Sequence, residues 1–358
     1  MTAPDALGGG GARVPKSSGA ALQQPDTPAG GKGWRKWVLG GLLLAGVALT
    51  VGFILHFGWR PIAGSVGAVG PGGFAVFCGY TLLVFVLLGW SWFVIAPDLS
   101  YRHLPAFIFG RLAREAAADT LPLAQLGGFV MGARAASLLG APATLAVATC
   151  IVDLGAEMLG QLLFTAVGVA IIAQHAPSGF PHQVLDPALA VGLIVGVVTA
   201  GLFIFSQQTG LRLLDRFSAS WPPAMKAQLS SMQDALQGLY RRPARPIISV
   251  VAHFAAWIAA MGGVWLVLRF MGAPLSFPSV IAMESLIYLL RSAAFFVPGA
   301  VGVLEGGYVL LGPVFGLHPE TALGLSLIKR GRDFAIGLPA VFVWQMLEGK
   351  RLLRRGKR

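Results

Sequence analysis

Long apolar runs separated by short polar or charged linkers dominate this chain. Six runs are close to the length that crosses a bilayer as a helix, about 20 residues, and they cover approximately residues 37–57, 73–96, 142–173, 188–206, 247–269 and 321–346. Backbone groups inside a bilayer must be hydrogen-bonded within the protein, which favours helices over open strands. The pattern predicts an all-α, polytopic integral membrane protein with about 6–8 transmembrane helices.

Lysine and arginine are distributed unevenly among the linkers. Residues 98–140 carry four and 207–246 carry six, whereas 58–72 carries one and neither 174–187 nor 270–278 carries any. Because cytoplasmic loops are enriched in Lys and Arg, the N-terminus, the two basic linkers and the C-terminal tail are predicted to be cytoplasmic. The protein is therefore expected in the bacterial inner membrane, multi-pass, with both termini inside.

A charge-bearing module appears twice inside the apolar sequence. The first copy contains, in order, Arg114, Pro122, Pro142, Asp153 and Glu157. The second copy contains, in order, Arg291, Pro298, Pro319 and the charged cluster 329–333. The Arg-to-Pro spacing is 8 residues in one copy and 7 in the other, and the Pro-to-Pro spacing is 20 and 21. Because the linker charges give the two halves opposite orientations, we predict two inverted-topology repeats, about 37–173 and 188–346.

Glycine and proline break each module into short apolar pieces. The pieces cover 104–118 and 122–140 in the first half, and 279–297 and 299–317 in the second. Proline removes a backbone donor and glycine permits positive φ, so broken helices are expected there. The pieces are compatible with re-entrant hairpins and with full spans, and both preserve the opposite orientation of the two halves.

Composition agrees with a membrane protein and bears on its binding partners and on the role of its two cysteines. The chain has 358 residues, is 55% hydrophobic and only 12% charged, and has a mean hydropathy of +0.71. Its net charge of +12 lies in juxtamembrane clusters, which favours anionic lipid headgroups over nucleic acid as partners. Cys78 and Cys150 lie in apolar runs and are predicted to be packing residues, not metal ligands.

Three regions are expected along the chain. Residues 1–33 are rich in Gly, Ala, Pro and Ser and are predicted to form a disordered cytoplasmic leader. Residues 34–346 form the transmembrane domain, and 347–358 form a basic cytoplasmic tail. Residues 223–240 carry apolar side chains at helical spacing, which predicts an amphipathic helix that either lies in the membrane interface or packs on the helix bundle.

The charged residues of the second module are candidates for ligand binding. Four are cationic, namely Arg291, Lys329, Arg330 and Arg332, and two are anionic, namely Glu305 and Asp333. On insertion scales an isolated charge near the bilayer centre costs about 2.5–3.5 kcal/mol, so these groups must be paired, hydrated or reserved for a ligand. The cationic surplus favours an anionic lipid headgroup, with the two carboxylates balancing charge or coupling to protons.

Local geometry leaves room for plainer interpretations of the same cluster. Asp333 lies three and four residues after Arg330 and Lys329, so an ion pair within one helix is available. Glu305 can equally pair with an arginine only to hold the fold, and the 329–333 cluster can lie at the membrane interface instead of inside it.

A helix break is expected between the arginine and the cluster. The residues that predict it are Pro298, Gly299, Gly302 and Gly306. Amides exposed at a helix N-terminus attract anions, and transporters use such breaks to hold substrate headgroups.

The first module contains a comparable set of charges. Arg114 and Arg134 flank the expected break at Pro122 and are assigned to headgroup binding as well. Asp153 and Glu157 are four residues apart and repel each other on one helix face, unless Arg114 or Arg134 lies between them or they share a proton. We therefore assign the two carboxylates to charge balance or proton coupling.

The sequence favours a transporter over an enzyme. It contains no Gly-x-Ser-x-Gly elbow, no His-Glu-x-x-His, no Walker loop and no cysteine dyad. No cofactor and no metal are predicted. His253 lies in an apolar run and is interpreted as a packed intramembrane imidazole.

Residues 291–345 resemble a known family. The pattern Arg291, Pro298-Gly299 and Gly302-Val-x-Glu305-Gly306, followed by a hydrophobic hairpin and a basic cluster, is similar to the flippase-like transmembrane region of lysylphosphatidylglycerol synthases. The Glu-Gly-Gly-Tyr version, with Leu-Ile-Lys-Arg-Gly-Arg-Asp after it, most resembles the hopanoid-biosynthesis-associated branch. In hydropathy the resemblance extends over about 37–346. Bifunctional members continue into a soluble aminoacyltransferase domain that this sequence lacks, so the chain is not expected to make lysyl-lipid by itself.

The resemblance implies that the protein moves a lipid between leaflets. We expect an amphipathic lipid with an anionic or hopanoid-related headgroup as cargo, and membrane lipids and lipid- or hopanoid-biosynthetic enzymes as partners. Two alternatives stay open at this point. One is a membrane enzyme that modifies a lipid, with Glu305 or Asp333 as general base, and the other is a non-catalytic scaffold for lipid or hopanoid biosynthesis. The sequence does not indicate an oligomeric state.

Overall fold

The computed structural model describes residues 33–120, 124–175, 182–217, 222–294 and 297–355. Throughout these ranges the regular structure is helical, without strands, which confirms an all-α polytopic protein. The chain separates into Met1–Val38, of which only the start of the first helix is described, and a compact unit, Leu39–Arg358. The expected leader, 1–33, therefore lies almost entirely outside the described residues.

Eleven α-helices follow one another along the described chain. They are α1 (Gly33–Phe57), α2 (Trp59–Ile95), α3 (Leu104–Thr120), α4 (Ala124–Leu138), α5 (Ala143–His175), α6 (His182–Phe217), α7 (Pro223–Tyr240), α8 (Ala244–Phe270), α9 (Phe277–Ala293), α10 (Val303–Leu311) and α11 (Pro319–Arg355). Short 3-10 turns lie before α3 and on both sides of α10, at Tyr101–His103, Pro298–Ala300 and Pro313–Phe315.

Six segments of the described chain are long and apolar enough to cross a membrane. Five of them lie in α1, α2, α5, α6 and α8, as the apolar runs predicted. The sixth is Pro298–Phe315, where the expectation was 321–346. The helix expected at 321–346 does exist as α11, but the charges at 329–333 lower its hydropathy below that of an ordinary span.

The second helix differs from the sequence expectation at its start. Residues 58–72 were predicted to be a linker, whereas α2 begins at Trp59 and is 37 residues long. Gly70, with φ of 62°, and Pro71 kink it near the end of that predicted linker. A glycine followed by a proline accommodates a bend without unfolding the segment on either side.

The helices of the two modules are too short to cross a bilayer. At about 1.5 Å per residue, the 17 residues of α3 and of α9 extend about 25 Å, and the nine residues of α10 extend only about 14 Å. The hydrocarbon core is about 30 Å thick. We therefore interpret α3–α4 and α9–α10 as re-entrant hairpins, although Pro298–Phe315 as a whole has the composition of a span.

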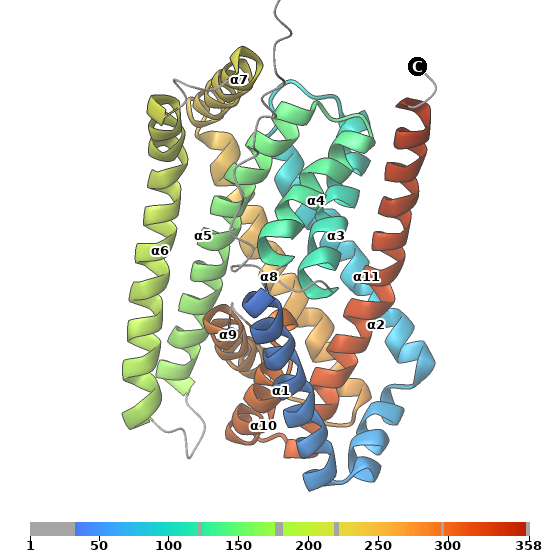
Figure 1. Cartoon of the computed structure of the whole chain (residues 1–358). Coiled ribbons are helices and arrows are strands. Elements are labelled where there is room, and N and C mark those ends of the chain that lie inside the picture. The colour runs from blue at the N-terminus through green and yellow to red at the C-terminus, as the bar shows by residue number, and fades with distance from the viewer. Residues whose placement is uncertain (1–32, 121–123, 176–181, 218–221, 295–296, 356–358) are drawn as a thin grey trace, which may run out of the picture. The chain divides into compact units, whose positions relative to one another are not determined.

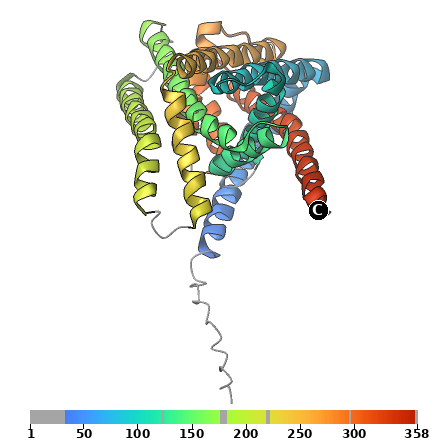
Figure 2. The ribbon, with the colours of Figure 1, turned by 90° about the horizontal axis from the view of Figure 1, so that it is seen from above.

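The two hairpins lie in opposite halves of the compact unit. In Figure 1, α3 and α4 occupy the half nearer α7, and α9 and α10 occupy the other half. Each hairpin is followed in the chain by a long helix, α5 or α11. Figure 2 views the molecule from the α7 end, where α11 lies beside α3 and packs against it. The two inverted-topology repeats stay a prediction.

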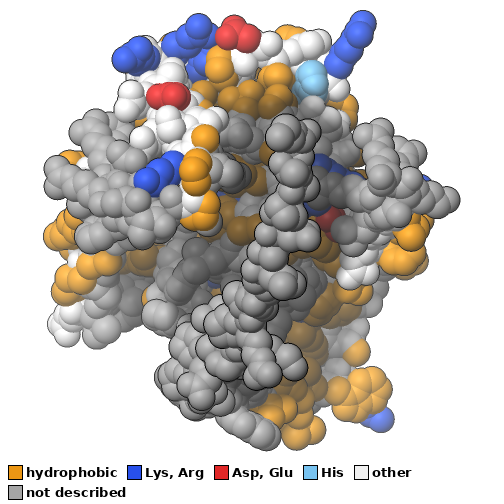
Figure 3. Space-filling view, turned by 45° about the horizontal axis from the view of Figure 1, so that its top comes forward, with side chains coloured by type: hydrophobic (Ala, Val, Ile, Leu, Met, Phe, Trp, Pro, Cys, Tyr) orange, Lys and Arg blue, Asp and Glu red, His pale blue; other side chains and the backbone are white. Residues whose placement is uncertain are grey.

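The α7 end of the molecule carries basic side chains. Figure 3 turns this end toward the viewer and shows Lys and Arg side chains there together with apolar surface. Exposed basic residues in α7 and in the linkers after α2 and α7 are Arg102, Lys226, Arg241 and Arg242. Leu236 and Leu239 of α7 are buried against Ile95 and Ala148, so this amphipathic helix packs on the bundle. Of the expected basic tail, 347–355 continues α11 as helix.

Candidate functional site

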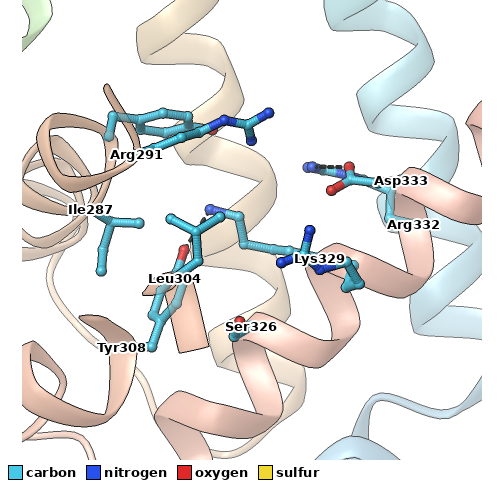
Figure 4. A pocket seen from close by; sticks show the side chains of 10 residues that line it. Ile287, Arg291, Leu304, Tyr308, Ser326, Lys329, Arg332 and Asp333 are labelled. Carbon is cyan, nitrogen blue, oxygen red and sulfur yellow. Dashed lines mark hydrogen bonds and ion pairs between the residues drawn. The ribbon is translucent and has the colours of Figure 1, made fainter. Parts of the chain in front are cut away.

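A small cavity lies where α9, α10 and α11 meet. Its volume is about 30 Å³, which is room for one or two water molecules. It is lined by Ile287, Tyr288, Arg291, Leu304, Tyr308, Ser326, Lys329, Arg330, Arg332 and Asp333. Figure 4 shows Arg291, from the end of α9, pointing across the cavity toward Arg332 and Asp333 of α11. The structure thus brings the second-module charges to one place.

The backbone of the α9–α10 hairpin breaks where glycine and proline predicted it. Gly299 has φ of 57° and Gly302 has φ of 81°, values that glycine adopts without the steric cost of a side chain. Helix α10 begins directly after Gly302, whose N–H donates to Glu305 Oε2 at 2.7 Å. A carboxylate in this position satisfies an otherwise unpaired amide and interacts favourably with the positive end of the helix dipole. The Gly302 amide at the start of α10 is therefore already hydrogen-bonded to a carboxylate of the same hairpin.

Arg330 fixes the broken hairpin to α11. Its guanidinium donates to the Gly299 carbonyl at 2.8 Å and to Glu305 Oε1 at 2.9 Å. Glu305 is 1% exposed, so its charge is compensated almost entirely by this arginine and by the Gly302 amide. The plainer interpretation of Glu305, a carboxylate paired to an arginine, describes its contacts correctly.

Lys329 takes part in a buried three-residue network. Its Nζ lies 2.6 Å from Glu284 Oε2 and 2.5 Å from the Tyr308 hydroxyl. The Tyr308 hydroxyl donates to Glu284 Oε1 at 2.5 Å. Glu284 is fully buried, which makes Lys329 the cation that compensates it. The sequence interpretation overlooked Glu284, although one carboxylate in the apolar run 279–297 is itself a signal of an internal partner.

Asp333 does not form the ion pairs that its spacing from Lys329 and Arg330 makes available. Lys329 and Arg330 reach Glu284 and Glu305 on the hairpin, and Asp333 pairs with its neighbour Arg332 at 2.6 Å. The guanidinium of Arg332 also lies 4.9 Å from the centre of the Phe77 ring on α2. Lys329 and Arg330 of α11 pair with the hairpin because α9 and α10 each carry a buried carboxylate.

Charge balance at this site leaves a positive excess. The cations are Arg291, Lys329, Arg330 and Arg332, and the anions are Glu284, Glu305 and Asp333. Four positive and three negative groups give a formal charge of plus one.

The first module forms a second buried charge cluster between α3 and α5. Arg114 donates to Asp153 Oδ2 at 3.1 Å and also contacts Glu157. Arg111 donates to both oxygens of Glu157, at 3.0 and 2.5 Å. Arg114, one of the two cations that the sequence offered, thus lies between the carboxylates, and Arg111 lies there too, with its guanidinium 3.7 Å from Asp153 Oδ2. The sequence interpretation did not assign Arg111 to this cluster.

Arg134 belongs to a different pair. It donates to the two oxygens of Glu348 on α11, at 2.9 and 2.5 Å, and its side chain is 35% exposed. It therefore joins α4 to α11 rather than compensating Asp153. Pro122, the predicted break of the first hairpin, lies outside the described residues.

His253 of α8 also contacts the first cluster. Its Nε2 lies 2.9 Å from Asp153 Oδ1, and the imidazole is fully buried. The interpretation as a packed imidazole was incomplete, because the ring is packed and also hydrogen-bonded to a carboxylate. No grouping of His, Cys, Asp and Glu in the described part of the chain could hold a metal ion.

A larger apolar cavity opens between α4, α5, α6 and α7. Its volume is about 670 Å³. Polar side chains at its wall are Arg134, Ser137, Ser206 and Gln207, and the remaining lining residues are apolar, among them Phe129, Val147, Leu154 and Phe203. A cavity of this character within apolar helices suits a hydrocarbon chain better than water.

Comparison with known proteins places the chain in one family. The family model described as the lysylphosphatidylglycerol synthase TM region matches residues 37–340. No curated protein and no solved structure matches the chain.

Proposed function

The chain belongs to the family of lysylphosphatidylglycerol synthase transmembrane regions, and on that premise we propose that it translocates a lipid with an anionic headgroup between the leaflets of the inner membrane. The observation that carries this proposal is that four cationic side chains, those of Arg291, Lys329, Arg330 and Arg332, line one cavity inside a membrane protein. Charged groups at membrane depth are costly and usually functional, and an anionic headgroup would interact favourably with this group of cations.

Arg291 and Arg332 are the proposed first contacts of the headgroup. Both guanidinium groups line the cavity and lie on facing helices (Figure 4). Guanidinium binds phosphate through two parallel hydrogen bonds, which orients the ligand as well as attracting it. Lys329 and Arg330 are held by Glu284 and Glu305, so their proposed role is to keep the hairpin in place until the ligand competes for them.

Translocation requires the cavity to enlarge. A volume of about 30 Å³ excludes a phospholipid headgroup, so the structure corresponds to a closed arrangement. The α9–α10 hairpin is joined to α11 by the pairs Glu284–Lys329 and Glu305–Arg330. We propose that these pairs separate when the hairpin moves from α11, and that alternation between the two repeats exposes the site to each leaflet in turn.

The apolar cavity between α4, α5, α6 and α7 would receive the acyl chains. Its wall includes α4 of the first hairpin, through Phe129 and Val130. An amphipathic cargo needs a polar route for its headgroup and an apolar surface for its chains, and the two cavities provide one of each.

Reconstitution into sealed vesicles tests the proposed function. Fluorescent anionic and zwitterionic lipids would be placed in both leaflets, and dithionite would quench those on the outside. Faster quenching of inner-leaflet anionic lipid than in empty vesicles, with no chemically altered lipid detected by mass spectrometry, supports translocation. Modified lipid formed by the detergent-solubilised protein would instead support an enzyme. Vesicles indistinguishable from empty ones with every lipid would support the scaffold.

A further inference from the structure

The environment of His253 differs from that of a histidine that only fills space. The ring is fully buried, and its Nε2 contacts Asp153 Oδ1 at 2.9 Å. The other ring nitrogen, Nδ1, has no hydrogen-bond partner among the described residues. The nearby Arg111 Nε is likewise buried and unpartnered within the described chain. A buried polar atom of this kind is rare and calls for a chemical explanation.

The charges around His253 sum to a negative value when the ring is neutral. Arg111 and Arg114 supply two positive charges, and Glu115, Asp153 and Glu157 supply three negative ones. Glu115 remains part of the cluster because it lies 2.7 Å from Arg111, with a side chain that is 27% exposed. The formal charge is therefore minus one, opposite in sign to that of the α9–α10–α11 cluster.

Among the described residues, the other helices packed on α8 add no counter-charge to Asp153. Helix α2 contributes the Ser91 hydroxyl, which is hydrogen-bonded to Ser249, one turn before His253. Helix α9 carries Glu284, whose carboxylate is already held by Lys329. On α5, the backbone at Gly160 approaches the His253 side chain closely. The cation that completes the cluster is therefore best supplied by the imidazole itself.

We propose that His253 and Asp153 hold an exchangeable proton inside the membrane-embedded part of the protein. The proton comes from water and binds the imidazole, which then donates from Nε2 to Asp153 while Nδ1 also carries hydrogen. The formal charge of the cluster becomes zero. Histidine is suited to this role because small changes of environment move its protonation across neutral pH.

This proton site also gives the proposed translocation a means of coupling, and this step rests on the proposed function. Arg111 and Arg114 belong to the first hairpin, whereas Asp153 and Glu157 belong to α5. Movement of the hairpin away from α5 would leave the two carboxylates without their arginines, and protons would then replace the lost positive charge. Proton binding and hairpin movement are therefore linked, so that each favours the other.

Nitrogen-15 NMR of histidine-labelled protein in vesicles tests the site without any transport assay. A solvated histidine has a pKa of about 6.5 and is almost entirely neutral at pH 8. We expect one imidazolium signal in the wild type that is lost in His253→Gln. The control His318→Gln removes only the signal of an exposed histidine. A His253 signal that is neutral throughout pH 5–8 would overturn the proposal.

Two further variants separate the proton site from a structural role and from the proposed function. Asp153→Asn keeps the shape of the side chain but removes the carboxylate that the imidazolium contacts, so the imidazolium signal should become that of a neutral ring, even if His253→Gln does not fold. For coupling, the flipping rate of the wild type should change at least threefold between pH 6 and 8, and that of His253→Gln less than twofold. Equal pH profiles would overturn the coupling. A wild type that does not flip lipid refutes the proposed function, while the NMR result still decides the proton site.

Discussion

Arg111 and Glu284 are each the eighth residue of the first helix of their hairpin, α3 or α9, and they carry opposite charges. Arg111 pairs with Glu157 on α5, and Glu284 pairs with Lys329 on α11. Each hairpin is thus bound by a buried ion pair to the long helix that follows it, with the signs exchanged.

Removing the charge of Glu284 should destabilise the second repeat. Glu284→Gln leaves Lys329 as an uncompensated charge beside a fully buried site, and breaking a buried pair in this way typically costs about 3–5 kcal/mol. We expect a lower thermal unfolding midpoint in detergent. The double variant Glu284→Gln/Lys329→Met removes both charges and should recover most of the loss. A single variant as stable as the wild type would show that this pair does not hold the hairpin.

Glu305 should show two separable effects because it caps Gly302 and pairs with Arg330. Glu305→Gln keeps a hydrogen-bond acceptor for the cap but removes the charge, whereas Glu305→Ala removes both. Loss of a cap costs about 0.5–2 kcal/mol, so the alanine variant should unfold at a lower temperature than the glutamine variant. Equal midpoints for the two variants would contradict the capping role.

Much of the fold follows from local properties of the sequence. The apolar runs predict α1, α5, α6 and α8 because hydropathy and length alone decide whether a helix can cross a bilayer. The break before α10 follows from Pro298, Gly299 and Gly302, because these residues restrict the backbone regardless of what surrounds them. Asp153 and Glu157 lie four residues apart on one helix face, where their negative charges repel each other. A cation between them is one way to relieve that repulsion, and Arg114 lies there.

The pairing of charges between helices does not follow in the same way. Asp333 is within reach of Lys329 and Arg330 along one helix, but both cations turn to the hairpin. Glu284 lies 45 residues before Lys329, so their contact depends on how the hairpin folds back against α11. Spacing shows which side chains can meet within one helix, whereas a contact between helices is fixed by packing.

Gly302 should be intolerant of any side chain. Its φ is 81°, and a Cβ placed there would lie 2.7 Å from Gly46 Cα on α1. Gly316 is a matched control, since its φ is 89° and a Cβ there would meet nothing within 4 Å. Gly316→Ala should cost about 1–2 kcal/mol for the left-handed backbone. Gly302→Ala should cost clearly more, measured as detergent unfolding midpoint or folded yield, and equal costs would contradict a close contact between α1 and the break.

Arg134 should contribute little to stability. Its pair with Glu348 is partly exposed, with side chains 35% and 21% accessible, and pairs of this kind contribute about 0–1 kcal/mol. Arg134→Gln should therefore unfold within a few degrees of the wild type in detergent. A loss as large as that of Glu284→Gln would mean that the joint between α4 and α11 matters as much as the buried pairs.

The central claim, that the group of cationic side chains at the α9–α10–α11 cavity serves an anionic headgroup, is tested most directly by the flipping rate of Arg291→Gln and Arg332→Gln in sealed vesicles. The control is Arg242→Gln, an exposed arginine with a side chain 3.5 Å from Asp98. Equal amounts of folded, reconstituted protein would be compared with anionic and with zwitterionic fluorescent lipid. We predict that each cavity variant lowers the anionic-lipid rate at least tenfold, whereas the control stays within twofold of the wild type. Cavity variants that flip anionic lipid as fast as the control would contradict the claim.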